Sequence, residues 1–262
     1  MRIVVCVKQV PDVAEIRIDE VKHTLIRSGV PSILNPFDEF AVEEALRIRE
    51  KSGGDVTVIS MGPLQAKETL TKCLAMGADR AVLLSDPKFA GADTWATSKT
   101  LAMTIQKLGF DLVLCGMKAV DGETSQVGPE IAELLGIPHI SYVKRVEINN
   151  DKSLVAERMT EQGHQLVSSS IPCLLTATKA LNVPRIPTLL SQMAAKKKPI
   201  EIFTAESIGA QKDQVGLPGS RTHVLKVFTP NLRTGECKIV RAEEKDAIPQ
   251  LLGLLKKEGI TT

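Results

Sequence analysis

Residues 111–129, DLVLCGMKAVDGETSQVGP, place a polar, glycine-containing loop between two apolar patterns. Residues 111–115 are mostly apolar, which is typical of a buried parallel strand, and residues 130–135 have the spacing of a helix. The loop therefore joins the carboxyl end of a strand to the amino end of a helix. In an open α/β sheet ligands bind at this point, because the strand ends leave a crevice and the first helical turn offers unpaired N–H groups to an anion.

The side chains of this loop suit a nucleotide. Residues 124–126 (Thr-Ser-Gln) can add hydrogen-bond donors, Gly122 and Gly128 let the backbone come close to a ligand, and Asp121 can accept from a ribose hydroxyl. Asp, Thr and Ser are also the usual residues that cap a helix. From these residues alone, a nucleotide site and an ordinary helix cap both stay open.

Strand and helix patterns alternate through the first half of the chain. Apolar runs at residues 2–7, 55–60, 80–84 and 111–115 predict strands, and helical spacing follows each of the first three. The first helix is expected to begin with Asn35 as cap and Pro36 in its first turn. Alternating residues at 15–18 and 23–27 predict a surface hairpin. Strands that alternate with helices in this way predict βαβ units and a parallel sheet.

The pattern changes after residue 136. Alternating runs at 139–148, 154–159 and 165–168 predict antiparallel strands at the edge of the sheet, and residues 172–176 predict a last buried strand. The fold class is therefore α/β, a mostly parallel, doubly wound, Rossmann-like sheet of the adenine-nucleotide-binding kind, with antiparallel edge strands and an extended C-terminal arm. We expect the nucleotide-binding domain to span residues 1–180. Residues 181–262, with one helical pattern at 245–258, bury too little apolar surface to fold alone and are expected to wrap around a partner subunit.

Composition excludes several classes of function. The formal charge of +2 and the few aromatic residues, one Trp, one Tyr and six Phe, argue against a nucleic-acid partner. No apolar run approaches the length of a membrane span. Five cysteines without a C-x-x-C pair are typical of reduced, buried thiols in a cytoplasmic protein. The four histidines lack metal-ligand spacing, and no nucleophile or phosphate-loop motif is present. The chain can hold a nucleotide but has little with which to attack one.

Three further loops are expected at the same edge of the sheet, at residues 6–8, 35–38 and 61–63. Converging loops are stronger evidence for a ligand site than any single loop. Simpler interpretations stay open for each, because Cys6 can be a core residue, Asn35 a helix cap, and Gly62 with Pro63 the start of a helix.

Seven motifs follow one another over most of the chain: residues 5–12 (VCVKQVPD), 35–44 (NPFDEFAVEE), 61–65 (MGPLQ), 75–80 (AMGADR), 121–129 (DGETSQVGP), 181–185 (LNVPR) and 193–198 (MAAKKK). In this order they resemble the beta subunit of electron transfer flavoproteins. The resemblance implies a heterodimer with an alpha subunit that carries an electron-transferring FAD. It also implies a nucleotide on the beta subunit, contacted by Cys6, Lys8, Asn35, Pro36, Phe37, Asp38, Met61, Gly62, Gly116, Lys118, Ala119, Asp121, Gly122, Glu123, Thr124, Ser125, Gln126 and Val127.

The resemblance bears on which nucleotide is held. Residues 121–129 are similar to the form found in electron-bifurcating members, which hold a second FAD. Residues 90–98 (AGADTWATS) are similar to the loop beside that FAD, where Asp93, Thr94 and Thr97 are candidate polar contacts near the isoalloxazine. Residues 35–38 are also common in housekeeping members, which hold a structural AMP, so this alternative stays open.

The bifurcating type implies that NADH delivers a hydride to the beta-subunit flavin. One electron then passes through the alpha-subunit FAD to an acyl-CoA dehydrogenase-like partner, and the other to ferredoxin or flavodoxin. Two hypotheses from other classes are a nucleotide-binding regulatory protein that acts without flavin and an adenylate-transferring enzyme.

Residues 181–199 match the segment with which the family docks on partner dehydrogenases, and Leu189 falls at the position of its leucine anchor. An apolar side chain beside positive charge is a plausible binding hot spot. The simpler interpretation is a leucine packed on its own domain next to solvated lysines. The candidate partner-binding residues are Arg185, Leu189, Met193, Lys196, Lys197 and Lys198.

Overall fold

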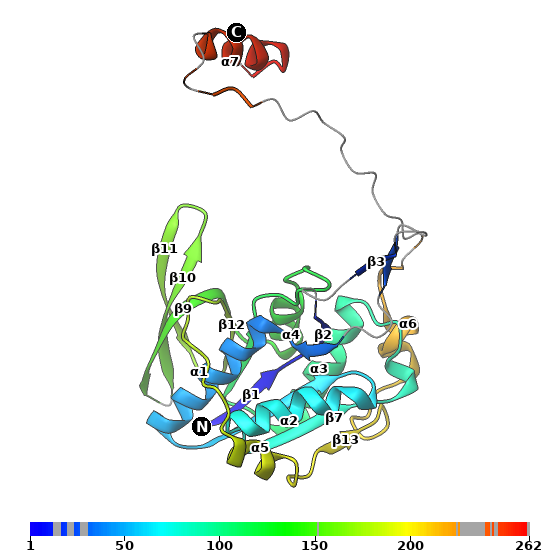
Figure 1. Cartoon of the computed structure of the whole chain (residues 1–262). Helices are drawn as coiled ribbons and strands as arrows, with labels where there is room; N and C mark the ends of the chain where they lie inside the picture. The colour runs from blue at the N-terminus through cyan, green and yellow to red at the C-terminus, as the bar shows by residue number, and fades with distance from the viewer. Residues whose placement is uncertain are drawn as a thin grey trace. The chain divides into compact units, whose positions relative to one another are not determined.

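The computed structural model describes residues 1–12, 17–19, 24–26, 31–150, 152–223, 225, 239–241, 243 and 246–260. The chain divides into two units, Met1–Leu225 and Lys226–Thr262 (Figure 1). The first unit is built on a sheet, and the second contains one helix within its described residues.

The described residues of the first unit form a nine-stranded sheet in the order β11-β10-β9-β12-β8-β1-β6-β7-β13. Neighbouring strands from β9 to β13 in this order are parallel, whereas β10 is antiparallel to both β9 and β11. The predicted mostly parallel sheet with antiparallel edge strands is therefore confirmed. The strands are β1 (Arg2–Cys6), β6 (Asp55–Met61), β7 (Arg80–Leu84), β8 (Leu112–Gly116), β9 (His139–Asn150), β10 (Ser153–Thr160), β11 (Gly163–Ser170), β12 (Cys173–Ala177) and β13 (Glu201–Phe203).

Two short antiparallel pairs complete the described strands. β2 (Gln9–Pro11) pairs with β5 (Ser32–Leu34), and β3 (Arg17–Asp19) pairs with β4 (Thr24–Ile26). The second pair confirms the predicted hairpin in its backbone, although the turn between its strands lies outside the described residues.

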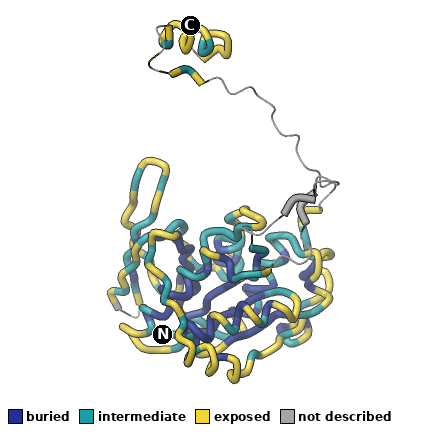
Figure 2. Tube along the Cα trace, viewed as in Figure 1, coloured by how far each residue is buried: buried dark blue, intermediate teal, exposed yellow. Residues whose placement is uncertain are grey.

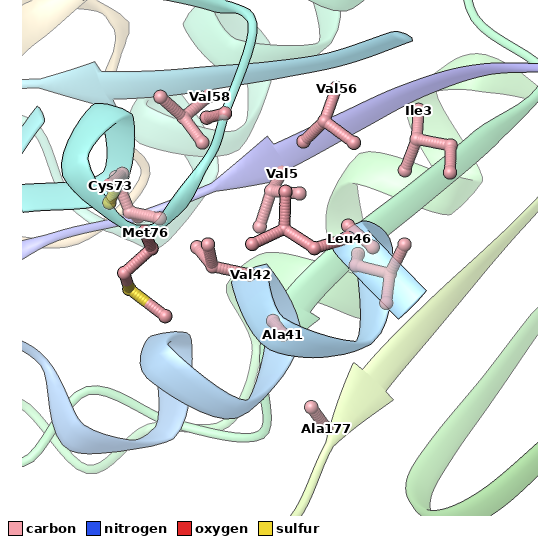
Figure 3. Close-up of a cluster of buried hydrophobic side chains, with 14 of the residues drawn as sticks. Ile3, Val5, Ala41, Val42, Leu46, Val56, Val58, Cys73, Met76 and Ala177 are labelled. Carbon is pink, nitrogen blue, oxygen red and sulfur yellow. The ribbon is translucent and has the colours of Figure 1, made fainter. Parts of the chain in front are cut away.

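Helices cover both faces of the sheet. The α-helices of this unit are α1 (Pro36–Ser52), α2 (Lys67–Met76), α3 (Thr94–Leu108), α4 (Val127–Leu135), α5 (Leu189–Ala195) and α6 (Gly216–Gly219). Its described residues also include the 3₁₀ turns η2 (Leu64–Ala66), η3 (Pro87–Phe89) and η4 (Lys212–Gln214). Because successive strand residues point to opposite faces, the sheet supplies side chains to two cores. One core packs β1 and β6 against α1 and α2 (Figure 3), and the other packs the opposite face against α3 and α4.

The strand order changes direction at β1. The chain passes from β1 to β6 and β7 on one side, and then returns to β8 on the other side of β1. Loops that leave β1 and β8 diverge to opposite faces of the sheet, and a crevice forms between the strand ends at such a point. The fold therefore places the loop at residues 116–127 at the position where α/β proteins bind ligands.

Residues beyond 180 are more structured than the sequence predicts. The only helix expected there is at 245–258, and α7 (Ala247–Lys257) confirms it, but α5 and β13 are not predicted. β13 extends the sheet beside β7, and Ala195 of α5 is buried against the first core. Both elements are too short to give a periodic signal. Within the second unit, α7 is largely exposed (Figure 2), and its exposed apolar residues include Ile248, Leu251 and Leu252.

Candidate functional site

The loops that follow β1 and β8 meet through an ion pair. Lys8 follows β1, and its Nζ lies 2.8 and 2.7 Å from the two carboxylate oxygens of Asp121, in the loop after β8. A second pair lies within the β8 loop, where Lys118 Nζ is 2.7 Å from Glu123 Oε1. We call the edge of the sheet where β1 and β8 end the rim. Lys8 and Lys118, both at the rim, are each paired with a carboxylate.

Asp38, in the first turn of α1, joins three segments under this ion pair. Its Oδ2 accepts the N–H of Lys8 at 2.7 Å, and its Oδ1 accepts the N–H of Gly116 at 3.2 Å and the amide of Asn35 at 2.8 Å. Burial raises the pKa of Asp38 from 3.8 to about 7, although these hydrogen bonds oppose the shift. The carboxylate fixes the ends of β1 and β8 to the start of α1.

Asn35 differs from its predicted role as a side-chain cap. It immediately precedes α1, but its side chain makes no capping hydrogen bond. Its amide instead donates to the Lys118 carbonyl at 2.9 Å, and its Oδ1 accepts the N–H of Val120 at 3.2 Å. A buried amide needs both donors and acceptors, and the β8 loop offers both. Asn35 therefore holds the loop that the sequence identifies as the ligand site.

Gly116, the last residue of β8, is required by close packing. A Cβ at this position would lie 2.3 Å from Asp38 Oδ1 and 2.8 Å from Phe37 Cβ. Gly122, in the middle of the loop, has no atom within 4 Å of a Cβ placed there. The two glycines thus have different roles: Gly116 lets two elements approach each other, and Gly122 faces open space.

The end of the β8 loop has an unusual backbone. Glu123 and Ser125 have φ values of 54° and 56°, in the left-handed region, and Gln126 is in the right-handed helical region. Such alternation turns successive N–H groups toward one side and forms a concave anion site called a nest. Among the hydrogen bonds of the described residues, none uses the N–H groups of residues 124–127. These groups precede and begin α4, so the helix dipole also favours an anion there.

The start of α3 lies against the start of α4. Thr94 Oγ1 is 3.1 Å from Glu130 Oε1 and 3.4 Å from Gln126 Oε1, and Ser98 Oγ donates to Glu130 Oε2 at 2.8 Å. This brings Thr94 to the candidate site, whereas Thr97 lies one turn further along α3. Ser98 and Glu130 were missed by sequence reasoning, because a serine inside a helix and a glutamate in a first turn are unremarkable by themselves.

The remaining predicted contacts occupy strand ends and the adjoining backbone. Cys6 ends β1 in register with Cys115 of β8, and both are buried. A hydrogen bond with Cys6, together with burial, raises the pKa of the Cys115 thiol. Met61 ends β6, and the N–H of Gly62 donates to the Leu84 carbonyl at 3.0 Å. Pro36 and Phe37 begin α1, and Ala119 and Val127 lie in the β8 loop and the first turn of α4.

The predicted partner-binding residues lie on a separate segment that α1 also supports. Arg185 Nε donates to Glu43 Oε2 at 2.8 Å, and Arg185 Nη1 donates to Glu50 Oε1 at 2.6 Å. Beyond this clamp, Leu189 and Met193 are 73% and 55% exposed, as is typical of residues available to a partner. Lys196 and Lys197 are exposed, and Lys198 donates to the Ala78 carbonyl at 3.0 Å.

A cavity of about 420 Å³ is lined by Met103, Gln106, Lys107, Ser207 and Ile208. These residues include the far end of α3, whereas the rim of the sheet is next to its beginning. The cavity is therefore distinct from the candidate site. Within the ranges that the structure describes, no helix has the length and apolar character needed to cross a bilayer.

The site combines backbone N–H groups and polar side chains at the carboxyl ends of parallel strands, and comparison with known proteins identifies the family. The electron transfer flavoprotein domain matches residues 22–208. The chain belongs to this family, as one of its beta subunits. It is 52% identical over 262 residues to the electron transfer flavoprotein subunit beta of Thermoanaerobacterium thermosaccharolyticum. The aligned region covers 99% of this chain and 100% of the relative.

Two other relatives have different names. The caffeyl-CoA reductase-Etf complex subunit CarD of Acetobacterium woodii is 46% identical, over 99% of this chain and 100% of its own. Protein FixA of Azorhizobium caulinodans is 43% identical, over 93% of this chain and 90% of its own. Membership in this family implies electron transfer, a flavin or AMP ligand and an alpha-subunit partner.

Proposed function

We propose that this electron transfer flavoprotein beta subunit holds an FAD at the rim formed by β1, β8 and α4. Paired with its alpha subunit, it would take electrons from NADH and divide them. One would go to ferredoxin or flavodoxin, and the other, through the alpha-subunit FAD, to an acyl-CoA dehydrogenase-like partner. The single observation that carries the proposal is the run of N–H groups at residues 124–127 that have no acceptor among the described residues, beside a loop that Asn35 and Asp38 hold by hydrogen bonds.

The residues present fit a dinucleotide. The N–H groups of residues 124–127 and the hydroxyls of Thr124 and Ser125 provide neutral donors for a diphosphate, and Asp121 can accept from a ribose hydroxyl. Lys8 and Lys118 can turn from their carboxylate partners toward the phosphates, since exposed ion pairs contribute only about 0–1 kcal/mol. Thr94, next to Gln126, is the candidate contact to the isoalloxazine, with Thr97 behind it.

A flavin bound there supplies one- and two-electron redox chemistry, while the protein orients it and sets the electrostatics around it. The chain contributes fixed dipoles in the form of backbone N–H groups and hydroxyls. The buried Asp38 acts indirectly, because its oxygens are occupied by Lys8, Asn35 and Gly116. Similarity to CarD, a subunit of a complex with a reductase, supports the bifurcating assignment.

The alternative is a housekeeping carrier with structural AMP. The same N–H groups suit one phosphate as well as two, and residues 35–38 are compatible with either type. We rank this alternative second because residues 90–98 resemble the loop beside an additional flavin.

The decisive experiment is to count cofactors in the heterodimer purified after co-expression with its alpha subunit. We expect two FAD per heterodimer. One FAD with one AMP would select the housekeeping carrier. A heterodimer without any adenine nucleotide on this subunit would reject both the FAD and the AMP assignment.

Thr94→Val should shift the visible spectrum of the second flavin, whereas Thr71→Val, on α2 across the sheet, should leave it unchanged.

A further inference from the structure

The chain segment at residues 201–222 is bound along the loop that connects β7 to α3. Ser85 donates its N–H to the Phe203 carbonyl at 3.0 Å, and Ala205 donates its N–H to Asp86 Oδ2 at 3.0 Å. Further on, the N–H of Leu217 donates to the Ala90 carbonyl at 2.9 Å. These bonds attach the end of the first unit to the body of the fold.

Asp93 is the last and most highly bonded point of this attachment. Its Oδ1 accepts the N–H of Ala96 at 2.9 Å and so caps α3. Its Oδ2 accepts the N–H groups of Arg221 and Thr222, both at 2.8 Å, and the Thr222 hydroxyl at 3.0 Å. Its own N–H donates to Ser220 Oγ at 2.9 Å. Both carboxylate oxygens are therefore occupied, one by the helix and the other by the segment.

The pKa of Asp93 agrees with this arrangement. Burial alone would raise it, but hydrogen bonds from Ala96, Thr222 and Arg221 outweigh burial and lower it. The group is therefore an ionised acceptor at neutral pH, and charge-assisted hydrogen bonds of this kind are stronger than neutral ones.

Arg221 makes a second contact with the start of α3. Its guanidinium carbon lies 5.0 Å from the centroid of the Trp95 ring, within the range of a cation–π interaction. Trp95 is the single tryptophan of the chain. Its fluorescence can therefore report whether Arg221 is in place.

We propose that Asp93 is a positioning residue that fixes the point from which the chain leaves the first unit toward Lys226–Thr262. This role differs from the contact near a flavin that the sequence suggested, and it does not depend on any bound nucleotide. Because Thr94 is adjacent, the anchor and the candidate site share the start of α3.

The test is Asp93→Asn in the full chain. Asparagine is as good a helix cap as aspartate, so α3 should be preserved. Its amide nitrogen, however, is a donor facing the N–H groups of Arg221 and Thr222. Trypsin should then cleave after Arg221 at least about tenfold faster than in the wild type, since opening of the segment costs less. Trp95 emission should change with it, and Arg221→Ala should reproduce the change in emission.

Asp86→Asn is the matched control, because it alters the same loop but not the bonds to Arg221. It should leave cleavage after Arg221 at the wild-type rate. Asp93→Ala should both release the segment and lower the melting temperature, because it also removes the cap.

The proposal would be overturned if Asp93→Asn were cleaved after Arg221 at the wild-type rate with unchanged Trp95 emission. An equal rise at every trypsin site would also overturn it, because it would assign Asp93 to the general stability of α3. Loss of flavin without release of Arg221 would instead favour a role as a cofactor contact.

Discussion

Two carboxylates of α1, Asp38 and Glu43, are buried to a similar degree, 5% and 2% exposed, but their pKa values move in opposite directions. Asp38 lies at the rim where β1 and β8 end and accepts only from neutral amides and backbone N–H groups, and burial raises its pKa. At Glu43 burial is outweighed by hydrogen bonds from Arg185 and Arg47, which lower its pKa. Glu43 is held by two charged partners and Asp38 by neutral donors, and this difference in partners accompanies the opposite directions of their pKa shifts.

The opposite pKa shifts of Asp38 and Glu43 correspond to two structural roles of α1. At its first turn, α1 organises the rim of the sheet through a carboxylate that titrates near neutral pH. Further along, it holds the segment that contains Leu189 through a charged clamp that stays ionised. The rim is expected to respond to pH, and the clamp is expected to be insensitive to it.

The largest expected effect is the pH dependence at Asp38. Its folded pKa of about 7 exceeds the ordinary value of 3.8, so the stability it contributes is complete below pH 4 and is lost as pH rises through 7. This amounts to at most about 4 kcal/mol, at 1.36 kcal/mol per pKa unit. Asp38→Asn should lack this loss, and urea unfolding at pH 5 and pH 8 will measure the part of it above pH 5, about 3 kcal/mol. Equal pH dependence in both proteins would mean that Asp38 is ionised throughout.

Next in size is Gly116→Ala. The new methyl would lie 2.3 Å from Asp38 Oδ1, so either the start of α1 or the end of β8 must move, at a cost of about 3 kcal/mol. Gly122→Ala is the control, because open space surrounds that position. Thermal unfolding of both variants will compare them. Similar stability in the two would show that the rim adapts and is not fixed by close packing.

A smaller effect is expected at the clamp. Glu43→Gln removes the charge that pairs with Arg185 and should cost about 1–3 kcal/mol, the range for hydrogen bonds to charged groups. Glu50→Gln should cost less than about 1 kcal/mol, because Glu50 is largely exposed. Chemical denaturation at pH 7 will give both values. A larger loss for Glu50 than for Glu43 would contradict the assignment of Glu43 as the centre of the clamp.

The smallest effect on stability is expected for Leu189→Ala. This side chain is 73% exposed, so the free energy of unfolding should stay within about 0.5 kcal/mol of wild type. If the segment docks on a dehydrogenase, affinity for that partner should fall by at least about tenfold, which is typical of an anchor residue. Leu166→Ala, at an equally exposed site on β11, should change neither property. Unchanged affinity in Leu189→Ala would remove the leucine from the docking site.

Much of the first unit was predictable because its signals are local. Apolar runs gave the parallel strands, and the long helices followed from spacing and from punctuation by Pro36 and Gly109. β13 and α5 were missed because a three-residue strand and a seven-residue helix depend on neighbours distant in sequence. The position of the candidate site was predicted from a loop that follows a strand, but the hydrogen-bond partners of its side chains were not predicted.

The sequence by itself determined the α/β fold, the edge of the sheet where the candidate site lies and the family, because periodicity and contiguous motifs are properties of neighbouring residues. Only the tertiary structure decided that Asn35 supports a loop more than 80 positions away, that Asp38 is shared by three segments, and that Asp93 anchors Arg221 and Thr222. A side-chain oxygen of Asn or Asp can cap a helix, contact a ligand or anchor a distant segment of the chain. Which role an oxygen takes depends on the donors that the folded chain brings to it.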